Sequence, residues 1–113
     1  MNIGCDIVKI DRFKCIKNGF IEKILSKEEI EIYNMKESNN RIQYLAGRFA
    51  LKEAIIKTFC GKKTVLMNEI SILNDENGAL ICKYKNYNIM GSIAHEKEYA
   101  IAYALLLEEI WIN

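Results

Sequence analysis

The feature that most constrains this chain is residues 44–57, a mostly apolar stretch that also carries four charged side chains. The stretch contains no proline and few β-branched residues, so its composition predicts a helix. At about 100° per residue, the apolar side chains cover almost the whole circumference, and most of this helix must be buried. A charge on a buried helix is unfavourable unless it is paired or binds a ligand. The four charges are therefore the first candidates for a functional site.

These charges form two groups on the predicted helix. Arg48 and Lys52 project from one face, whereas Glu53 and Lys57 lie one turn apart on another. A Glu–Lys pair at this spacing stabilises a helix by roughly 0.2–0.5 kcal/mol, so Glu53 and Lys57 can form a simple ion pair. They can also converge on a ligand, as a carboxylate and a cation. The residues alone leave both interpretations open.

The length and charge of the chain limit its class. With 113 residues and no break in composition, residues 1–113 are expected to form one domain. The net charge of +1 hides a basic first half, +5 over residues 1–63, and an acidic second half, −4 over residues 64–113. The basic half suits an anionic partner. Its basic residues are too sparse for a dedicated nucleic-acid-binding protein.

The sequence predicts a cytoplasmic protein. It opens without the charged leader and apolar core of a signal segment. Its apolar run at residues 99–107 is too short to cross a membrane. The four cysteines show no CxxC spacing, which argues against a zinc ribbon or a thioredoxin-like pair. Each cysteine has apolar neighbours, so buried free thiols in a reducing compartment are expected.

Residues 2–10 alternate like a strand that is buried on one face. Ile3 and Ile7 fall on one side, and Gly4, Asp6 and Val8 fall on the other. Aspartate is uncommon inside strands, so the presence of Asp6 needs an explanation. Its carboxylate can accept hydrogen bonds from a neighbouring loop, or it can be a metal ligand or catalytic group with space beside Gly4. Both interpretations stay open.

The rest of the chain predicts helices followed by antiparallel strands. Three helices are expected: residues 11–18 ending at Gly19, residues 26–36 with Ser26 as N-cap, and a long central helix from Asn39 or Asn40 to Gly61. Four further strands are expected at residues 69–73, 79–85, 87–93 and 98–107, with Asn77-Gly78 as a hairpin turn. This order implies an α+β fold with an antiparallel sheet packed against the long central helix.

His95 is the only histidine, and it follows Ser92 by three positions, in the turn expected between the last two strands. A lone histidine at a turn is more often a surface or hydrogen-bonded residue than a catalytic one. At a strand end, however, the Ser92 hydroxyl and the His95 imidazole can meet one anion. Both interpretations of His95 are carried forward.

Three segments of this chain together resemble one known family. They are IGCDIV at residues 3–8 followed by Arg12-Phe13, LAGRFALKEA at residues 45–54, and SIAH at residues 92–95 with Tyr99-Ala100. In sequence, order and spacing they are similar to the holo-[acyl-carrier-protein] synthases, the small 4′-phosphopantetheinyl transferases. The resemblance covers nearly the whole chain, and GRFA-x-KEA is its highly specific part.

This resemblance implies a fold, an activity and an assembly. Members of the family transfer 4′-phosphopantetheine from coenzyme A to a serine of acyl carrier protein, and the by-product is adenosine 3′,5′-bisphosphate. The reaction requires Mg²⁺ and serves fatty acid biosynthesis. The family forms homotrimers with active sites in the clefts between subunits. The same fold, cofactor, partners and homotrimer are therefore expected here.

The functional positions of the family fall on named residues of this chain. Its metal ligands fall on Asp6 and Glu53, and Lys57 joins these two as a catalytic residue. Two carboxylates with a substrate diphosphate suit Mg²⁺. The positions at the coenzyme A site fall on Arg48, Lys57, Ser92 and His95. The carrier-protein surface falls on the basic segment after the first strand, with Arg12, Phe20 and Lys23 at the contact.

The chain departs from the family pattern at two places. Position 94 is alanine where the family has serine or threonine, which removes a hydroxyl contact. The loop at residues 60–64 replaces a glycine-rich loop and is about two residues shorter, so Lys62 and Lys63 are candidates to supply charge there.

Two other functions fit the same residues. A Mg²⁺-dependent nucleotide or coenzyme A hydrolase would use the same carboxylates with water as the nucleophile. The second alternative is a trimeric protein that binds coenzyme A or the carrier without catalysis. A transferase needs the carrier to consume coenzyme A, whereas a hydrolase does not.

Overall fold

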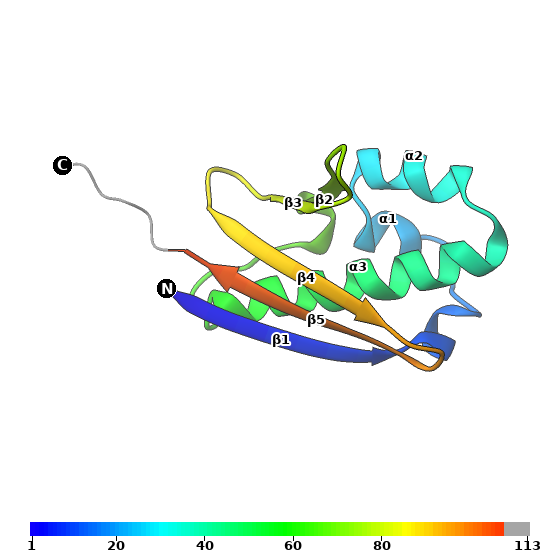
Figure 1. Ribbon diagram of the computed structural model, residues 1–113, viewed down its shortest axis with the longest axis horizontal. Coiled ribbons are helices and arrows are strands. Elements are labelled where there is room, and N and C mark those ends of the chain that lie inside the picture. The colour runs from blue at the N-terminus through cyan, green and yellow to red at the C-terminus, as the bar shows by residue number, and fades with distance from the viewer. Residues whose placement is uncertain (108–113) are drawn as a thin grey trace.

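In the computed structural model, which describes residues 1–107, five strands form one antiparallel sheet in the order β1-β5-β4-β3-β2 (Figure 1). The strands are β1 (Asn2–Lys9), β2 (Ser71–Asn74), β3 (Leu80–Lys83), β4 (Ile89–His95) and β5 (Tyr99–Leu106). The helices are η1 (Ile10–Phe13), α1 (Phe20–Ile24), α2 (Lys27–Met35), α3 (Ser38–Thr58) and η2 (Met67–Glu69). The predicted α+β fold is confirmed. None of the helices within residues 1–107 is long and apolar enough to cross a membrane.

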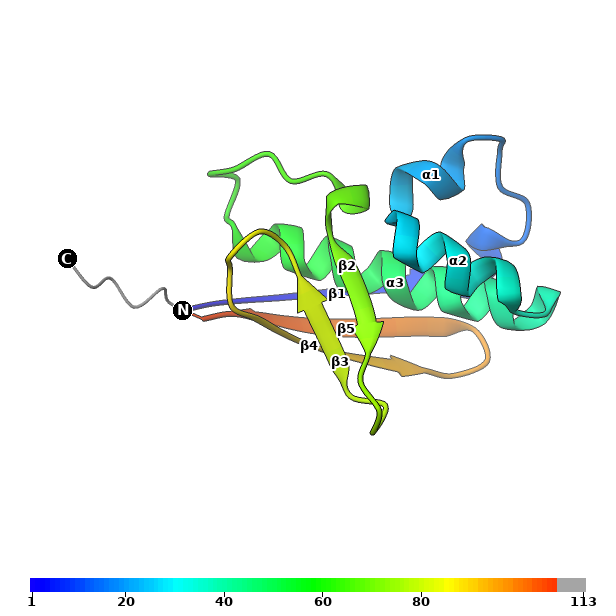
Figure 2. The same ribbon diagram turned by 90° about the horizontal axis from the view of Figure 1, so that it is seen from above.

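Helix α3 is the centre of the molecule. It lies along one face of β1, β5 and β4, and α1 and α2 lie on the other side of α3 (Figure 1). Figure 2 shows that β2 and β3 run in a different direction from the other three strands. A single register pair, Cys82 with Ile89, joins β3 to β4. This short connection allows the β2–β3 hairpin to point away from the direction of β1, β5 and β4. The core therefore has a sheet on one side of α3 and two short helices on the other.

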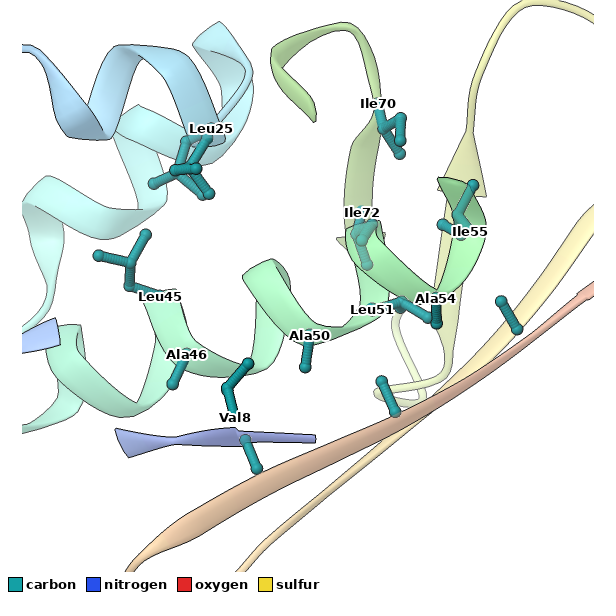
Figure 3. Close-up of a cluster of buried hydrophobic side chains, with 14 of the residues drawn as sticks. Val8, Leu25, Leu45, Ala46, Ala50, Leu51, Ala54, Ile55, Ile70 and Ile72 are labelled. Carbon is teal, nitrogen blue, oxygen red and sulfur yellow. The ribbon is translucent and has the colours of Figure 1, made fainter. Parts of the chain in front are cut away.

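Small residues bring α3 and the sheet close together. Ala46, Ala50 and Ala54 of α3 are buried toward the sheet (Figure 3). On β5, Ala100, Ala102 and Ala104 are buried as well. In β1, a Cβ atom at Gly4 would lie 2.0 Å from the carbonyl oxygen of Ala54, so only glycine allows this approach. The space expected beside Gly4 is therefore filled by the backbone of α3. This contact holds β1, which carries Asp6, against the last turns of α3.

The opposite face of the sheet is apolar and exposed. Strand β1 alternates as predicted, because Val8 is buried whereas Ile3 and Ile7 are 71% and 58% exposed. Met90 of β4 and Tyr103 of β5 are 59% and 51% exposed. We refer to Ile3, Ile7, Met90 and Tyr103 as the open sheet face, since no helix within residues 1–107 covers it (Figure 1).

A buried ion pair joins the helices to the hairpin. Lys52 and Glu29 are both 0% exposed and form a salt bridge. The Lys52 ammonium also donates hydrogen bonds to the carbonyl oxygens of Ile24, at 2.7 Å, and Met67, at 3.0 Å. The second carboxylate oxygen of Glu29 accepts from the Ile72 amide at 3.0 Å. The charge of Lys52 is therefore satisfied inside the core, where it connects α1, α2, α3, η2 and β2.

Some helix boundaries differ from the prediction. The helix expected at residues 11–18 is only the short turn η1, and Gly19, expected to end it, is the N-cap of α1 with φ of 85°. Ser26 is confirmed as the N-cap of α2. The caps expected at Asn39 or Asn40 are wrong, because α3 begins at Ser38. The short connection from α2 turns the chain into α3 before it reaches either asparagine.

The cysteines are less buried than predicted. Cys5, Cys15 and Cys60 are exposed free thiols, so the prediction is wrong for these three. Cys5 alternates with the buried positions of β1 and therefore points to the outer side of the sheet. Cys82 is half-buried, and burial raises the pKa of its thiol to about 11. Apolar neighbours in sequence do not predict burial in a strand, where successive residues face opposite ways.

Candidate active site

Asp6 and Lys57 meet where β1 packs against the end of α3. The Lys57 ammonium lies 3.1 Å from a carboxylate oxygen of Asp6 and donates a hydrogen bond to the Cys5 carbonyl at 2.9 Å. Asp6 is half-buried, whereas the Lys57 side chain is 53% exposed. Lys57 therefore pairs with Asp6 and not with Glu53, so the simple helical ion pair is the wrong interpretation of these charges.

Glu53 lies beside this pair and has no partner of its own. It is half-buried, and within residues 1–107 its carboxylate makes no hydrogen bond or ion pair. Burial and the nearby Asp6 carboxylate raise the pKa of Glu53, against the opposing effect of Lys57 and Arg12. Two carboxylates thus approach each other from β1 and α3, and a cation between them would relieve their repulsion.

Arg12 lies at the edge of the same site. Its guanidinium is 5.5 Å from the ring centre of Phe49 and 5.8 Å from that of Phe13, within cation–π range. Phe49 precedes Glu53 by one turn of α3. The resemblance assigned Arg12 to carrier binding alone, and no spacing in the sequence relates residue 12 to residue 53. The fold brings them together because η1 directly follows β1.

The expected carrier-protein surface is partly assembled in this chain. Arg12 and Phe20 line one pocket of about 240 Å³, together with Phe13, Cys15, Ile16 and Lys17. The rings of Phe13 and Phe20 are 6.3 Å apart. Lys23 is exposed on α1 but does not line this pocket. The surface thus combines an apolar depression with basic side chains around it.

Arg48 lies on a different side of α3 from Glu53. It is only 7% exposed and donates hydrogen bonds to the Ile72 carbonyl at 3.2 Å and to the Asn74 side chain at 2.9 Å. Its guanidinium also stacks on the ring of Tyr44 at 4.5 Å. Among the described residues, the Arg48 Nε and the Tyr44 hydroxyl are buried without a hydrogen-bond partner. This chain therefore holds Arg48 against the β2–β3 hairpin, apart from the two carboxylates.

Ser92 and His95 do not converge within one chain. His95 packs on α3, where its Nε2 is 3.1 Å from the Gln43 carbonyl oxygen and would be 2.7 Å from a Cβ atom at Gly47. Ser92 pairs with Tyr103 in the register of β4 and β5 and is exposed. Positions three apart in a strand face opposite sides of the sheet. The alternative in which both side chains meet one anion at a turn is not formed within a single chain, because β4 continues through His95.

The loop after α3 turns sharply. Cys60 and Gly61 have φ of 54° and 73°, so this segment reverses the chain in two residues. Lys62 is exposed, and the Lys63 ammonium lies 5.8 Å from the ring centre of Tyr87. Lys63 is therefore held toward the β3–β4 connection, and Lys62 is the freer of the two candidate charges.

The donor set at Asp6 and Glu53 suits a hard divalent ion. Mg²⁺ is commonly held by one or two carboxylates, waters and phosphate oxygens. No group of three or more His, Cys, Asp or Glu side chains with metal-binding geometry occurs in the described part of the chain. A site built from this pair thus needs further oxygen ligands from water or substrate. The unpartnered carboxylate of Glu53 beside Asp6 fits such a site.

Comparisons with known proteins agree on one family. A family model described as the 4′-phosphopantetheinyl transferase superfamily matches residues 2–104. A holo-[acyl-carrier-protein] synthase of Mycoplasma capricolum is 43% identical over 104 residues, which is 92% of each chain. That of Petrotoga mobilis is 40% identical, covering 95% of this chain and 96% of the relative.

Solved structures give the same result. The crystal structure of a holo-(acyl-carrier-protein) synthase from Bacillus anthracis in complex with CoA (3′,5′-ADP) has a TM-score of 0.86 and 32% identity, covering 93% of this chain and 94% of that one. The synthase of Helicobacter pylori in complex with coenzyme A has a TM-score of 0.77 and 32% identity, covering 93% and 99%.

Proposed function

Because the chain belongs to the 4′-phosphopantetheinyl transferase superfamily, we propose that Asp6, Glu53 and Lys57 form its active site as a holo-[acyl-carrier-protein] synthase. The reaction transfers 4′-phosphopantetheine from coenzyme A to a serine of acyl carrier protein and releases adenosine 3′,5′-bisphosphate. What supports the assignment is the ion pair of Asp6 with Lys57 at 3.1 Å, one helical turn after Glu53, whose pKa is raised by burial and by the Asp6 carboxylate. We expect the reaction to serve fatty acid biosynthesis in the cytoplasm.

Asp6 and Glu53 would hold Mg²⁺, with the diphosphate of coenzyme A as a further ligand. The ion would neutralise charge that builds on the phosphate during transfer. Lys57 is placed to assist from the same side, because its ammonium is half-exposed and tied only to Asp6 and a carbonyl oxygen. Removal of Lys57 is thus expected to lower the transfer rate by weakening stabilisation of the transferred phosphate.

The proton of the attacking serine must pass to a base. Water, Asp6 and Glu53 are the candidates. The reacting serine oxygen then forms a bond to the β-phosphorus of coenzyme A, while the bond from that phosphorus to the bridging oxygen breaks and adenosine 3′,5′-bisphosphate leaves.

A homotrimer would complete the coenzyme A site. The open sheet face exposes large apolar side chains, and exposed apolar patches of this kind mark protein–protein contacts. Ser92 points to that face, whereas His95 packs on α3. A coenzyme site that uses Arg48, Ser92 and His95 would therefore draw them from more than one copy of the chain. This arrangement agrees with active sites in clefts between subunits.

The carrier protein would dock on the basic segment around Arg12. The pocket shared by Arg12 and Phe20 offers apolar surface with a positive rim, which suits an acidic helix. Lys23 would add charge at the edge of the contact. Electrostatic attraction of this kind mainly raises the rate of association.

The test is formation of the 4′-phosphopantetheine adduct. The protein is incubated with coenzyme A, Mg²⁺ and apo acyl carrier protein, and the carrier serine is analysed by mass spectrometry. We expect the adduct with the unchanged chain and its loss with Asp6→Asn or Glu53→Gln. The matched control is Glu31→Gln, an exposed glutamate of α2, which should keep the rate. Consumption of coenzyme A without carrier would indicate a hydrolase, and retained transfer in either active-site variant would refute the metal site.

A further inference from the structure

Among the described residues, the charge of Arg12 has no ion-pair partner, although Arg12 lies on the same side of α3 as Glu53. Within residues 1–107 its guanidinium forms no hydrogen bond or ion pair, and its close neighbours are the rings of Phe13 and Phe49. Ring stacking holds the guanidinium in place while leaving its N–H groups available. Arg12 can therefore accept a carboxylate from outside without breaking an existing bond.

Glu53 lies between two cations along α3. Lys57 follows it by one turn, but the Lys57 ammonium is bonded to Asp6 and to the Cys5 carbonyl. Phe49 precedes Glu53 by one turn, and Arg12 lies over its ring. Residues four apart lie on the same face of a helix, so the guanidinium over Phe49 is on the face of α3 that carries Glu53. Of the two cations, Arg12 is the one that a partner can neutralise from outside.

Arg12 also belongs to the surface on which a carrier protein would dock. It lines the pocket of about 240 Å³ together with Phe13, Ile16 and Phe20. The same residue thus lines the docking pocket and holds its charge over Phe49, one helical turn from Glu53. A ligand that reaches one of these places changes the electrostatic potential at the other.

We propose that Arg12 couples docking of the acidic carrier protein to the divalent-ion affinity of Asp6 and Glu53. This inference rests on the proposed function of the two surfaces. In the free enzyme, the guanidinium charge opposes a divalent ion at the carboxylates. A carrier carboxylate that pairs with Arg12 offsets this charge, and the ion binds more tightly. By linkage, the bound ion tightens carrier binding by the same factor. The site is then fully loaded when the acceptor serine is present.

The expected size follows from Coulomb's law. One unit of charge near the two carboxylates changes divalent-ion affinity by about threefold to tenfold at low salt. The effect is expected to disappear near 1 M salt, where the Debye length is only about 3 Å. An effect that acted through packing of the Phe49 ring would not respond to salt in this way.

The test uses Mn²⁺ as a probe, with its dissociation constant measured by electron paramagnetic resonance in the presence of coenzyme A. The carrier has its acceptor serine replaced by alanine, so no transfer occurs. For the unchanged enzyme, we expect the carrier to tighten Mn²⁺ binding about threefold to tenfold. Arg12→Gln without carrier should bind Mn²⁺ more tightly than the unchanged enzyme, and carrier should add nothing further.

Two variants serve as controls. Arg12→Lys keeps the charge and should retain most of the coupling. Lys27→Gln removes one exposed positive charge at the start of α2, away from the docking pocket, and should behave like the unchanged enzyme. The measurement of Mn²⁺ affinity without carrier stays decisive even if Arg12→Gln binds the carrier poorly, because this measurement does not depend on carrier binding.

Equal Mn²⁺ affinity of Arg12→Gln and the unchanged enzyme without carrier would overturn the coupling. Equal tightening by carrier in both proteins would overturn it as well. These failures are distinct from failure of the proposed function. The metal site itself is tested by comparing Mn²⁺ binding of the unchanged enzyme with that of Asp6→Asn. If the unchanged enzyme does not bind Mn²⁺, or if Asp6→Asn binds it equally well, the metal site is refuted and the coupling with it.

Discussion

The ammonium of Lys57 lies 3.1 Å from a carboxylate oxygen of Asp6 and joins the last turn of α3 to the middle of β1. These residues are 51 positions apart in the chain. Their contact depends on the close approach of β1 to α3, which in turn depends on Gly4. The candidate active site is therefore a product of backbone packing between one strand and one helix, and variants that change this packing should change its chemistry.

Gly4→Ala is expected to separate β1 from α3. The added methyl group would lie 2.0 Å from the Ala54 carbonyl oxygen, and backbone cannot move aside as a flexible side chain can. We expect a loss of about 1–3 kcal/mol in the free energy of unfolding, as for other overpacked sites. Because Asp6 moves with β1, transfer should fall by roughly 100-fold. Urea unfolding and the rate of carrier modification measure the two effects.

The control for this variant is Gly78→Ala. Gly78 has φ of 84° and no atom within 4 Å of an added Cβ, so this change strains a turn without moving β1. It should cost about 1–2 kcal/mol of stability and leave the rate of carrier modification unchanged. A Gly4→Ala protein with normal transfer would contradict the role of this contact.

Lys52→Met is expected to destabilise the fold strongly. It leaves the fully buried Glu29 carboxylate without its ion-pair partner, which typically costs about 3–5 kcal/mol. The double variant Lys52→Met with Glu29→Gln should recover part of this loss, because no unpaired charge remains. Urea unfolding of the two single variants and the double variant gives the coupling energy. Strictly additive effects would contradict the importance of the pair.

Some features that depend on local sequence patterns, such as strand alternation and one helix cap, were predicted correctly. Alternation in β1 placed Asp6 on the inner face, and the Ser26 cap located the start of α2. The contact partners of the charged side chains were not predictable from the sequence. Lys52 pairs with Glu29 of another helix, and Arg12 is brought near Glu53 only by tertiary packing. These contacts have no signature in local spacing. The resemblance supplied an assignment that the residues alone left open, namely that Asp6 and Glu53 are expected to bind one metal ion.

Glu53→Gln is expected to stabilise the metal-free protein at neutral pH. Burial and Asp6 raise the pKa of Glu53, so the folded protein binds more protons than the unfolded chain at pH values just above the unfolded pKa. Stability then falls as pH rises through the raised pKa, and the ionised carboxylate opposes folding at pH 7.5. Removing the charge should raise the melting temperature there, and the difference should shrink below about pH 4.3.

Thermal melts of both proteins from pH 4 to 8, without metal, test this expectation. The exposed Glu31→Gln variant should show no comparable gain. A lower melting temperature for Glu53→Gln at pH 7.5, or a gain that does not vary with pH, would contradict the proposed environment of this carboxylate. Loss of transfer together with a gain of stability is the pattern expected of an active-site residue.

Ile7→Glu is expected to disrupt the proposed homotrimer. Ile7 is 58% exposed in the middle of the open sheet face, and a charge buried between copies there would be unpaired. Light scattering should give the mass of a monomer for this variant and of a trimer for the unchanged protein. Met35→Glu, at an 86% exposed methionine of α2, should leave the trimer intact. An unchanged mass for Ile7→Glu would exclude this face as the subunit contact.

The most direct test of the central claim is the position of a divalent ion in crystals of the protein grown with Mn²⁺ and coenzyme A. Anomalous diffraction locates manganese without reference to the protein model. We expect one manganese ion bound by carboxylate oxygens of both Asp6 and Glu53 and by a diphosphate oxygen of coenzyme A. An ion bound elsewhere, or held by one of these carboxylates while the other points away, would contradict it.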